Sequence, residues 1–150
     1  MKKILLLVSL VVFQIDAQKI SMREYLRLHG QPQGQVLDLS KQNIASLDGL
    51  QEIKDPSRIL VLNFANNNLT QIPFNIFEKF LNLEKLDISN NEITGLPAGI
   101  FDNLVKLKVL NVANNKFNTV PKNTFERLVN LEVLNGITRN QPNFLKQYSM

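Results

Sequence analysis

Hydrophobic residues recur along this chain with a spacing of 24 residues. In the unit that begins at Leu83, apolar side chains fall at the first, fourth, sixth and eleventh places, and an asparagine falls at the ninth. The units 24 residues earlier and later fill these places with Ile59, Leu62, Phe64, Asn67 and Leu69, and with Leu107, Leu110, Val112, Asn115 and Phe117. A further copy starts at Leu131 and then fades. Such self-similarity predicts stacked repeats that bury one continuous core.

The pattern inside each unit predicts its local structure. The alternation in Leu86-Asp87-Ile88 predicts a short strand with one buried face. A proline follows later in each unit, and because proline lacks an N–H it excludes a helix or sheet interior from the return leg. The second half of each unit also carries a phenylalanine in register, which predicts a stacked spine inside the convex side. The prolines and phenylalanines are Pro73, Pro97 and Pro121, and Phe77, Phe101 and Phe125.

The full pattern, L-x-x-L-x-L-x-x-N-x-L-x-x-L-P-x-x-x-F-x-x-L over residues 59–130, resembles the 24-residue extracellular type of leucine-rich repeat. The resemblance implies an α/β solenoid with about four to five repeats in residues 34–135, a short parallel sheet on the concave face, and an irregular or short-helical convex face. It also implies protein–protein recognition.

Asparagines at the ninth place predict a structural ladder formed by Asn67, Asn91 and Asn115. A sharp turn inside a solenoid leaves backbone N–H and C=O groups that need partners, and an amide can both donate and accept. A ligand site is the alternative for these residues. The first unit departs from the pattern, because Gln42 occupies the ninth place, no proline follows Leu47 and no spine phenylalanine is present.

The first 17 residues predict a signal peptide. Lys2 and Lys3 precede an apolar run at residues 4–13, which is too short to span a bilayer, and Ala17 precedes a possible cleavage site. The alternative is a buried N-terminal helix or strand. The predicted localisation is secreted or in the cell envelope, at the periplasm or surface. The short basic segment and the absence of cysteine are more typical of a bacterial than of an animal protein.

Both ends of the repeat array predict some form of cap. Residues 18–33 form the N-terminal capping region, in which the amphipathic spacing from Ile20 to His29 predicts a helix that Gly30 and Pro32 end. A partner-binding helix is the alternative. At the other end Gly136 replaces an apolar residue and should end the last strand. Residues 136–150 are predicted to be a tail or a partial cap.

Charge and composition favour neither nucleic-acid binding nor catalysis. Cleavage after Ala17 would lower the basic count from 17 to 15 and the acidic count from 13 to 12, which leaves a mild excess without a basic stripe. The chain has no cysteine and one histidine, His29. Asp38 and Asp87 could lie roughly 10 Å apart on an open surface, where carboxylates have little reason for tuned pKa values. We therefore expect no enzyme, cofactor or metal site.

The outward residues of the predicted strands are the candidate binding surface. The third places hold Val36, Val61, Lys85, Val109 and Val133, the fifth hold Asp38, Asn63, Asp87, Asn111 and Asn135, and the seventh hold Ser40, Ala65, Ser89, Ala113 and Ile137. From these, the predicted protein-binding residues are Asp38, Val61, Asn63, Lys85, Asp87, Val109 and Asn111. The alternative is that the polar column only keeps the sheet soluble.

The sequence thus predicts a secreted protein-binding module that holds its partner on the concave face. Two other classes remain open. One is a structural or self-associating protein of the cell envelope, such as an adhesin. The other is an enzyme accessory or a fragment of a larger repeat protein, because the last repeat fades before its pattern is complete.

Overall fold

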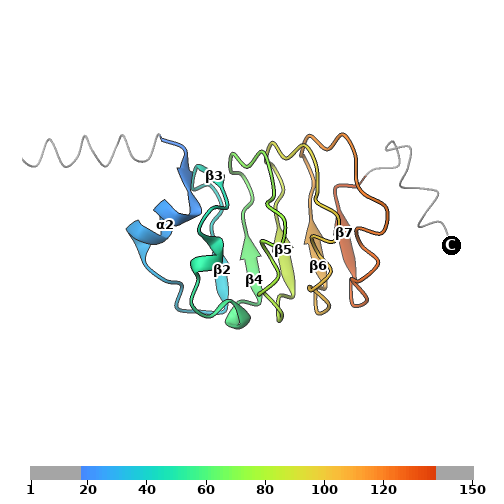
Figure 1. The fold of residues 1–150 in the computed structure, drawn as a ribbon, viewed down its shortest axis with the longest axis horizontal. Coiled ribbons are helices and arrows are strands. Elements are labelled where there is room, and N and C mark those ends of the chain that lie inside the picture. The colour runs from blue at the N-terminus through green and yellow to red at the C-terminus, as the bar shows by residue number, and fades with distance from the viewer. Residues whose placement is uncertain (1–17, 138–150) are drawn as a thin grey trace, which may run out of the picture.

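The computed structural model describes residues 18–137, in which five short parallel strands form one sheet. The strands are β2 (Val36–Asp38), β4 (Val61–Asn63), β5 (Lys85–Asp87), β6 (Val109–Asn111) and β7 (Val133–Asn135), and they lie side by side in this order (Figure 1). The predicted signal peptide at residues 1–17, and the tail from residue 138 onward, lie outside the described residues. The sheet and its repeated return legs confirm the predicted solenoid.

The strand register follows the repeat. Val36, Val61, Lys85, Val109 and Val133 are direct partners across the sheet, and so are the leucines that follow them, Leu37, Leu62, Leu86, Leu110 and Leu134. In a strand, alternate side chains point to opposite faces. The leucine column therefore faces the core, where Leu62, Leu86 and Leu110 are buried, and the flanking columns face outward.

The convex side is irregular, as expected. Two short 3-10 helices, η1 (Leu50–Glu52) and η2 (Pro56–Arg58), lie in the first unit, and turns replace them in the later units. The predicted phenylalanine spine is present. The rings of Phe77 and Phe101 stack with centroids 6.4 Å apart, and those of Phe101 and Phe125 stack at 6.0 Å. The spine fills the core under the convex turns.

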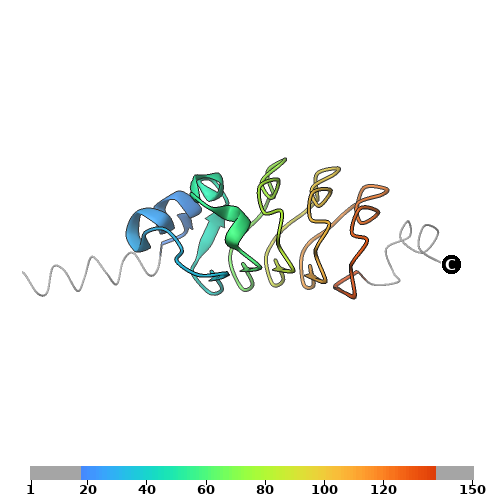
Figure 2. The same cartoon turned by 90° about the horizontal axis from the view of Figure 1, so that it is seen from below.

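The N-terminal end of the core is covered by helix α2 (Met22–His29), shown in blue in Figures 1 and 2. Met22 and Leu26 are buried against the first unit. The helix starts later than the sequence predicted, because Ile20 lies in a two-residue strand, β1 (Ile20–Ser21), which pairs in parallel with β3 (Ile44–Ser46). Ser21 is the N-cap, and its hydroxyl accepts a hydrogen bond from the Glu24 N–H.

The last described strand ends where the sequence predicted. Strand β7 stops at Asn135, and Gly136 follows with φ of 97°. A Cβ at Gly136 would lie 2.2 Å from the Cα of Ala113, so the backbones of neighbouring repeats touch at this point. Within residues 18–137, no helix combines the length and the apolar character that crossing a membrane requires.

Candidate functional site

All seven residues that the sequence singled out for binding lie on the outward face of the five-stranded sheet. We call this surface the sheet face and define it as the third-place and fifth-place columns of the five strands. The third-place residues are partly or fully exposed, with Val36 at 59%. The fifth-place residues are exposed at Asp38 and Asn135 and half-buried at Asn63, Asp87 and Asn111.

The fifth-place residues close a turn at the end of each strand. The Oδ1 atoms of Asp38 and Asp87 accept hydrogen bonds from the backbone N–H two residues later, at 3.0 Å and 2.8 Å. Asn63 and Asn111 make the same contact, at 2.9 Å and 3.2 Å. This Asx turn is a local bond that only a short Asp or Asn side chain makes well. The polar column therefore shapes the backbone, which the sequence reasoning did not foresee.

Adjacent strands also pair an amide with a carboxylate in this column. The Nδ2 atom of Asn63 donates to Asp38 at 3.0 Å, and that of Asn111 donates to Asp87 at 2.9 Å. The alternation of Asp and Asn avoids placing two carboxylates on neighbouring strands, where like charges destabilise a sheet. Both polar atoms of Asn63, Asp87 and Asn111 are thus engaged within the sheet, and Oδ1 of Asp38 accepts two hydrogen bonds, which keeps this column ordered.

These hydrogen bonds change the acidity of Asp38. The backbone N–H of Ser40, the Ser40 hydroxyl and the Asn63 amide all stabilise the charged carboxylate, and they lower the pKa of Asp38 below its usual value of 3.8 despite partial desolvation. A carboxylate held ionised in this way is a poor general acid. The geometry agrees with a structural and electrostatic role for Asp38.

The third-place column is apolar except at its centre. Lys85 lies in register between Val61 and Val109, and Val36 and Val133 complete the column. Lys85 is exposed, and among the described residues no carboxylate forms a salt bridge with it. Lys108, which directly precedes Val109 on the next strand, is instead paired with Glu84 at 3.0 Å. Lys85 is therefore a free cation in an apolar setting.

The seventh-place residues contribute less to the outward surface than the sequence predicted. Ala65 and Ser89 are buried, whereas Ser40, Ala113 and Ile137 are partly exposed. Each strand is only three residues long, so the period-two alternation ends at the fifth place and the chain turns inward. The Asn that follows at the eighth place takes up a left-handed conformation, as at Asn66 and Asn90 with φ of 59° and 52°.

The sequence reasoning missed two residues beside the N-terminal edge of the sheet. Tyr25 and His29 of α2 stack with ring centroids 4.2 Å apart. Tyr25 lies near Asp38, since burial and, secondarily, the Asp38 charge raise the pKa of the Tyr25 hydroxyl. Their spacing of four residues on one helix face was the available signal.

The ninth-place asparagines face the core side of the turn, away from the sheet face. The Asn91 Oδ1 accepts from the Leu69 N–H at 2.9 Å, and its Nδ2 donates to the carbonyls of Phe64 at 3.0 Å and Ile88 at 3.2 Å. Each amide thus binds its own turn and the preceding repeat. Asn67 and Asn115 make equivalent contacts, to Ile44 N and Leu39 O and to Ile93 N and Ile88 O. Both the oxygen and the nitrogen of each amide are therefore already hydrogen-bonded to the backbone, which favours the structural role over a ligand site.

The ladder explains why the first unit carries glutamine instead. The amide bonds reach back toward the preceding repeat, and the first unit has only the cap before it. The Gln42 side chain is exposed and donates to Ser40 O, while its backbone N–H donates to Asn67. The departure at Gln42 therefore marks the start of the ladder.

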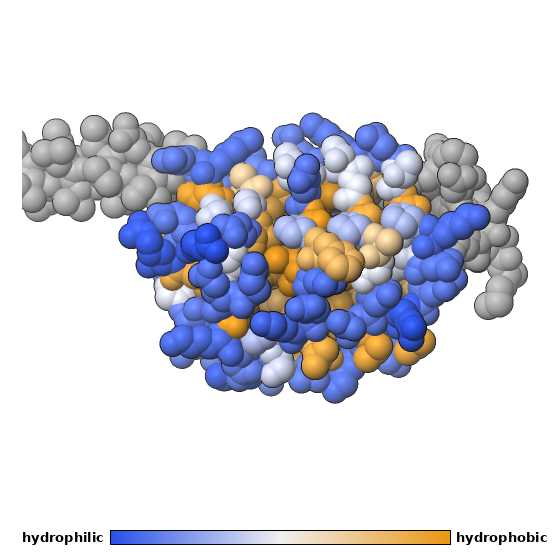
Figure 3. All heavy atoms as spheres, in the orientation of Figure 1, coloured by the Kyte–Doolittle hydropathy of each residue, from blue (hydrophilic) through white to orange (hydrophobic). Residues whose placement is uncertain are grey.

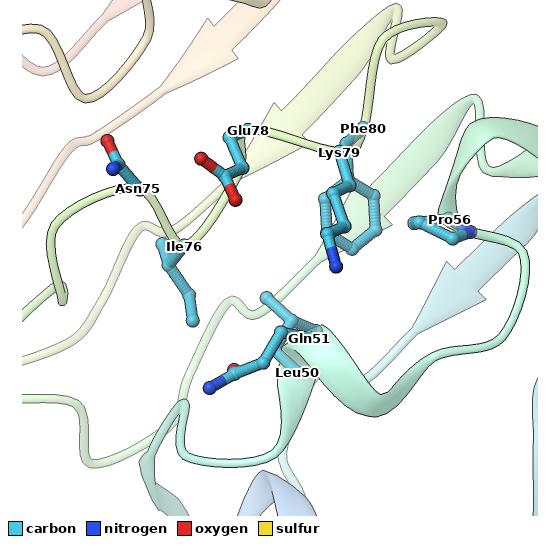
Figure 4. A pocket seen from close by; sticks show the side chains of 8 residues that line it. All are labelled: Leu50, Gln51, Pro56, Asn75, Ile76, Glu78, Lys79 and Phe80. Atoms are coloured by element: carbon cyan, nitrogen blue, oxygen red, sulfur yellow. The ribbon is translucent and has the colours of Figure 1, made fainter.

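Two hollows among the described residues are both smaller than the pocket that a small molecule usually occupies. A hollow between the first two convex turns, lined by Leu50, Pro56, Ile76 and Phe80 among others (Figure 4), encloses about 20 Å³, enough for roughly one water molecule. A second, beside the cap and lined in part by Arg58, encloses about 170 Å³. Ligand pockets usually exceed about 300 Å³. In residues 18–137, no three His, Cys, Asp or Glu side chains cluster as a metal site would require.

One further apolar surface lies outside the sheet face. Figure 3 shows a mostly hydrophilic side of the molecule with a row of hydrophobic spheres along its lower edge. Leu81, Val105 and Val129 occupy equivalent places in successive repeats and are 52%, 44% and 77% exposed. We call these three residues the turn stripe. Any test of the sheet face has to separate it from this stripe.

Comparisons with known proteins agree with the fold. The family model described as leucine rich repeat matches residues 81–141. The crystal structure of the leucine-rich repeat domain of APL1B is similar over 69% of this chain and 31% of its own, with 26% identity and a TM-score of 0.65. A chain of the LRIM1/APL1C complex is similar over 67% of this chain and 19% of its own, with 27% identity and a TM-score of 0.64. No curated protein matches the chain.

The fold of this chain is a leucine-rich-repeat solenoid. Such solenoids generally present an extended surface that binds other proteins, and they are typically scaffolds without catalytic chemistry. The chain spans under a third of the length of either solved chain, so it corresponds to only a few of their repeats.

Proposed function

We propose that this chain is a secreted protein-binding module of the 24-residue repeat type, and that its partner binds the sheet face. The observation that carries the proposal is the third-place column, a row of partly or fully exposed valines around one lysine without a salt bridge, on an ordered sheet. Exposed apolar rows bordered by polar residues are typical of protein-binding sites. The signal-like segment at residues 1–17 supports an extracellular or envelope location.

One similar structure gives indirect support, because it is a complex of LRIM1 with APL1C. A repeat solenoid of this kind can thus form part of an assembly of two different proteins. The sheet face spans about 20 Å across five strands, which suits a standard or small interface.

The test is capture of partners from the extracellular or surface fraction with the full chain as bait. The Val109→Arg change places a long charged side chain on the sheet face, next to the central Lys85, and should abolish capture. Val105→Arg, on the turn stripe, makes the same chemical change four residues away and should leave capture intact. Retention of the partner by the Val109→Arg protein would refute the sheet face as the binding surface.

The fifth-place residues are unsuitable for this test. Changes at Asp87 or Asn111 would remove an Asx turn and a cross-strand bond together with any contact to a partner. Valine positions avoid this because their side chains carry no hydrogen bonds. Thermal unfolding of both arginine variants, followed by circular dichroism, verifies that each remains folded.

A further inference from the structure

Lys85 places one positive charge in the apolar third-place column of the sheet face. Its backbone is in register with Val61 on one side and Val109 on the other, so the ammonium group rises from an apolar row. Some exposed cations on the repeats have partners, such as Lys116 with Glu92 at 3.3 Å and Arg58 with Asp55 at 3.7 Å, and among the described residues Lys85 is the cation that lies in the third-place column without one. A lone cation among valines favours a partner that supplies one carboxylate between apolar groups.

The spacing of the column indicates the shape of that partner. Neighbouring strands lie about 4.8 Å apart, so successive third-place side chains repeat at that distance across the sheet. Residues three or four apart on an α-helix are separated by about 4.5–6 Å along its axis. Same-face residues on an extended strand are about 6.6–6.8 Å apart and fall out of step with the column. A helix lying across the strands therefore matches the column better than an extended peptide.

We propose that the sheet face receives an amphipathic α-helix of a protein partner, laid along the third-place column with one acidic residue over Lys85. This proposal rests on the proposed protein-binding function and names the kind of partner. Apolar residues three or four positions before and after the acid would pack on Val61 and Val109. Five strands span about 19 Å, which a helix of about 13 residues covers.

The fifth-place column sets the orientation of the helix. Asp38 and Asp87 hold negative charge along one side of the row and are fixed there by hydrogen bonds. A second acidic residue on that side of the helix would be repelled, whereas amide or basic residues would be favoured. The face thus accepts one acid at its centre and rejects an evenly acidic helix.

Selection from a displayed library of helical peptides about 15 residues long tests this proposal. Three baits are used: the wild-type chain, Lys85→Glu, and Lys79→Glu, which makes the same charge change at an exposed convex residue. Wild type and Lys79→Glu should enrich helices with one central acid between apolar residues. Lys85→Glu should enrich helices with a central lysine or arginine.

Affinities of one selected peptide, measured by fluorescence anisotropy, complete the test. Lys85→Glu should weaken binding by about tenfold or more, and a lysine in place of the peptide acid should restore it. Failure to enrich helices, or equal preferences for all three baits, would overturn the proposal. If Val109→Arg abolishes capture of the natural partner while Lys85→Glu has no effect on it, only the helix proposal fails. Capture that survives both changes would overturn the sheet-face function as well.

Discussion

Short polar side chains perform three different tasks at neighbouring places of each repeat. In the third unit, Asp87 closes the Asx turn at the end of the strand, Asn90 adopts the left-handed conformation at φ of 52°, and Asn91 is buried with its amide in the ladder. Asn and Asp tolerate these geometries better than other residues, because the side chain is short and can bond to the nearby backbone. The Asn-rich runs of the sequence are therefore explained by the backbone geometry of each turn.

Asp38 should make the stability of the protein depend on pH. Its pKa is lowered in the folded state by the bonds from Ser40 and Asn63, so its contribution is present above the unfolded-state pKa and is lost as the pH falls through the folded value. Urea unfolding of wild type and Asp38→Asn at a series of pH values should show a gap at neutral pH that narrows below about pH 4. A gap that stays constant down to pH 2 would contradict the assignment.

Among individual residues, the sequence predicted the asparagines of the ladder and the outward third-place and fifth-place columns, because both follow from the repeat. It did not predict that the fifth-place residues are hydrogen-bonded within the sheet. That outcome depends on the three-residue length of the strands, which the period-two pattern alone leaves undefined. The burial of Ser89 and Ala65 has the same origin.

The capping helix is attached to the solenoid by apolar burial and by ion pairs. Helix α2 buries Met22 and Leu26 over the first unit, and Arg23 binds Asp48 at 2.9 Å and Glu52 at 2.8 Å. Such exposed ion pairs contribute little, typically below about 1 kcal/mol each. Apolar burial therefore holds most of the cap in place. The helix was predictable from its amphipathic spacing. The β1–β3 pairing was not, since it joins residues 24 apart whose partner choice no local pattern encodes.

Gly49 is the point at which the cap meets the first unit most closely. A Cβ there would lie 2.6 Å from the Cα of Arg23, and the residue has φ of 96°. Gly49→Ala should lower the free energy of unfolding by about 2–4 kcal/mol, because it adds backbone strain and a steric clash together. Urea denaturation followed by circular dichroism measures the change.

Gly95→Ala is the matched control. No atom lies within 4 Å of a Cβ built at Gly95, so the substitution should change stability by less than about 0.5 kcal/mol. Equal effects of the two substitutions would show that the close contact with Arg23 does not determine how the cap docks.

Residues 18–137 form a one-dimensional stack in which each strand of the five-stranded sheet pairs only with its neighbours. The sheet order β2-β4-β5-β6-β7 and the cross-repeat bonds of the asparagine ladder both have this property. In such a stack, stability is approximately a sum of repeat and nearest-neighbour terms. The sequence could predict this architecture, and the place of Lys85 in the third-place column, because the same pattern recurs, whereas the lack of a salt bridge to Lys85 depends on side-chain positions that the repeat does not define.

Double substitutions in the ladder should reveal this nearest-neighbour rule. Asn67 and Asn91 both donate to the carbonyl of Phe64, at 2.9 Å and 3.0 Å, whereas Asn67 and Asn115 share no acceptor. Asn91→Ala alone should cost about 1–3 kcal/mol, because it leaves buried backbone groups without a partner. The pair Asn67→Ala and Asn91→Ala should cost more than the sum of the single changes, since Phe64 then loses both side-chain donors.

The pair Asn67→Ala and Asn115→Ala should instead be additive within about 0.5 kcal/mol, because the two residues lie two repeats apart. Urea unfolding of the three single variants, the two double variants and the wild type gives both coupling energies. A neutral Asn91→Ala variant would refute the structural ladder itself. Equal coupling energies in the two pairs would mean that repeats two units apart affect each other's stability. The stack would then be globally cooperative, which contradicts the nearest-neighbour description.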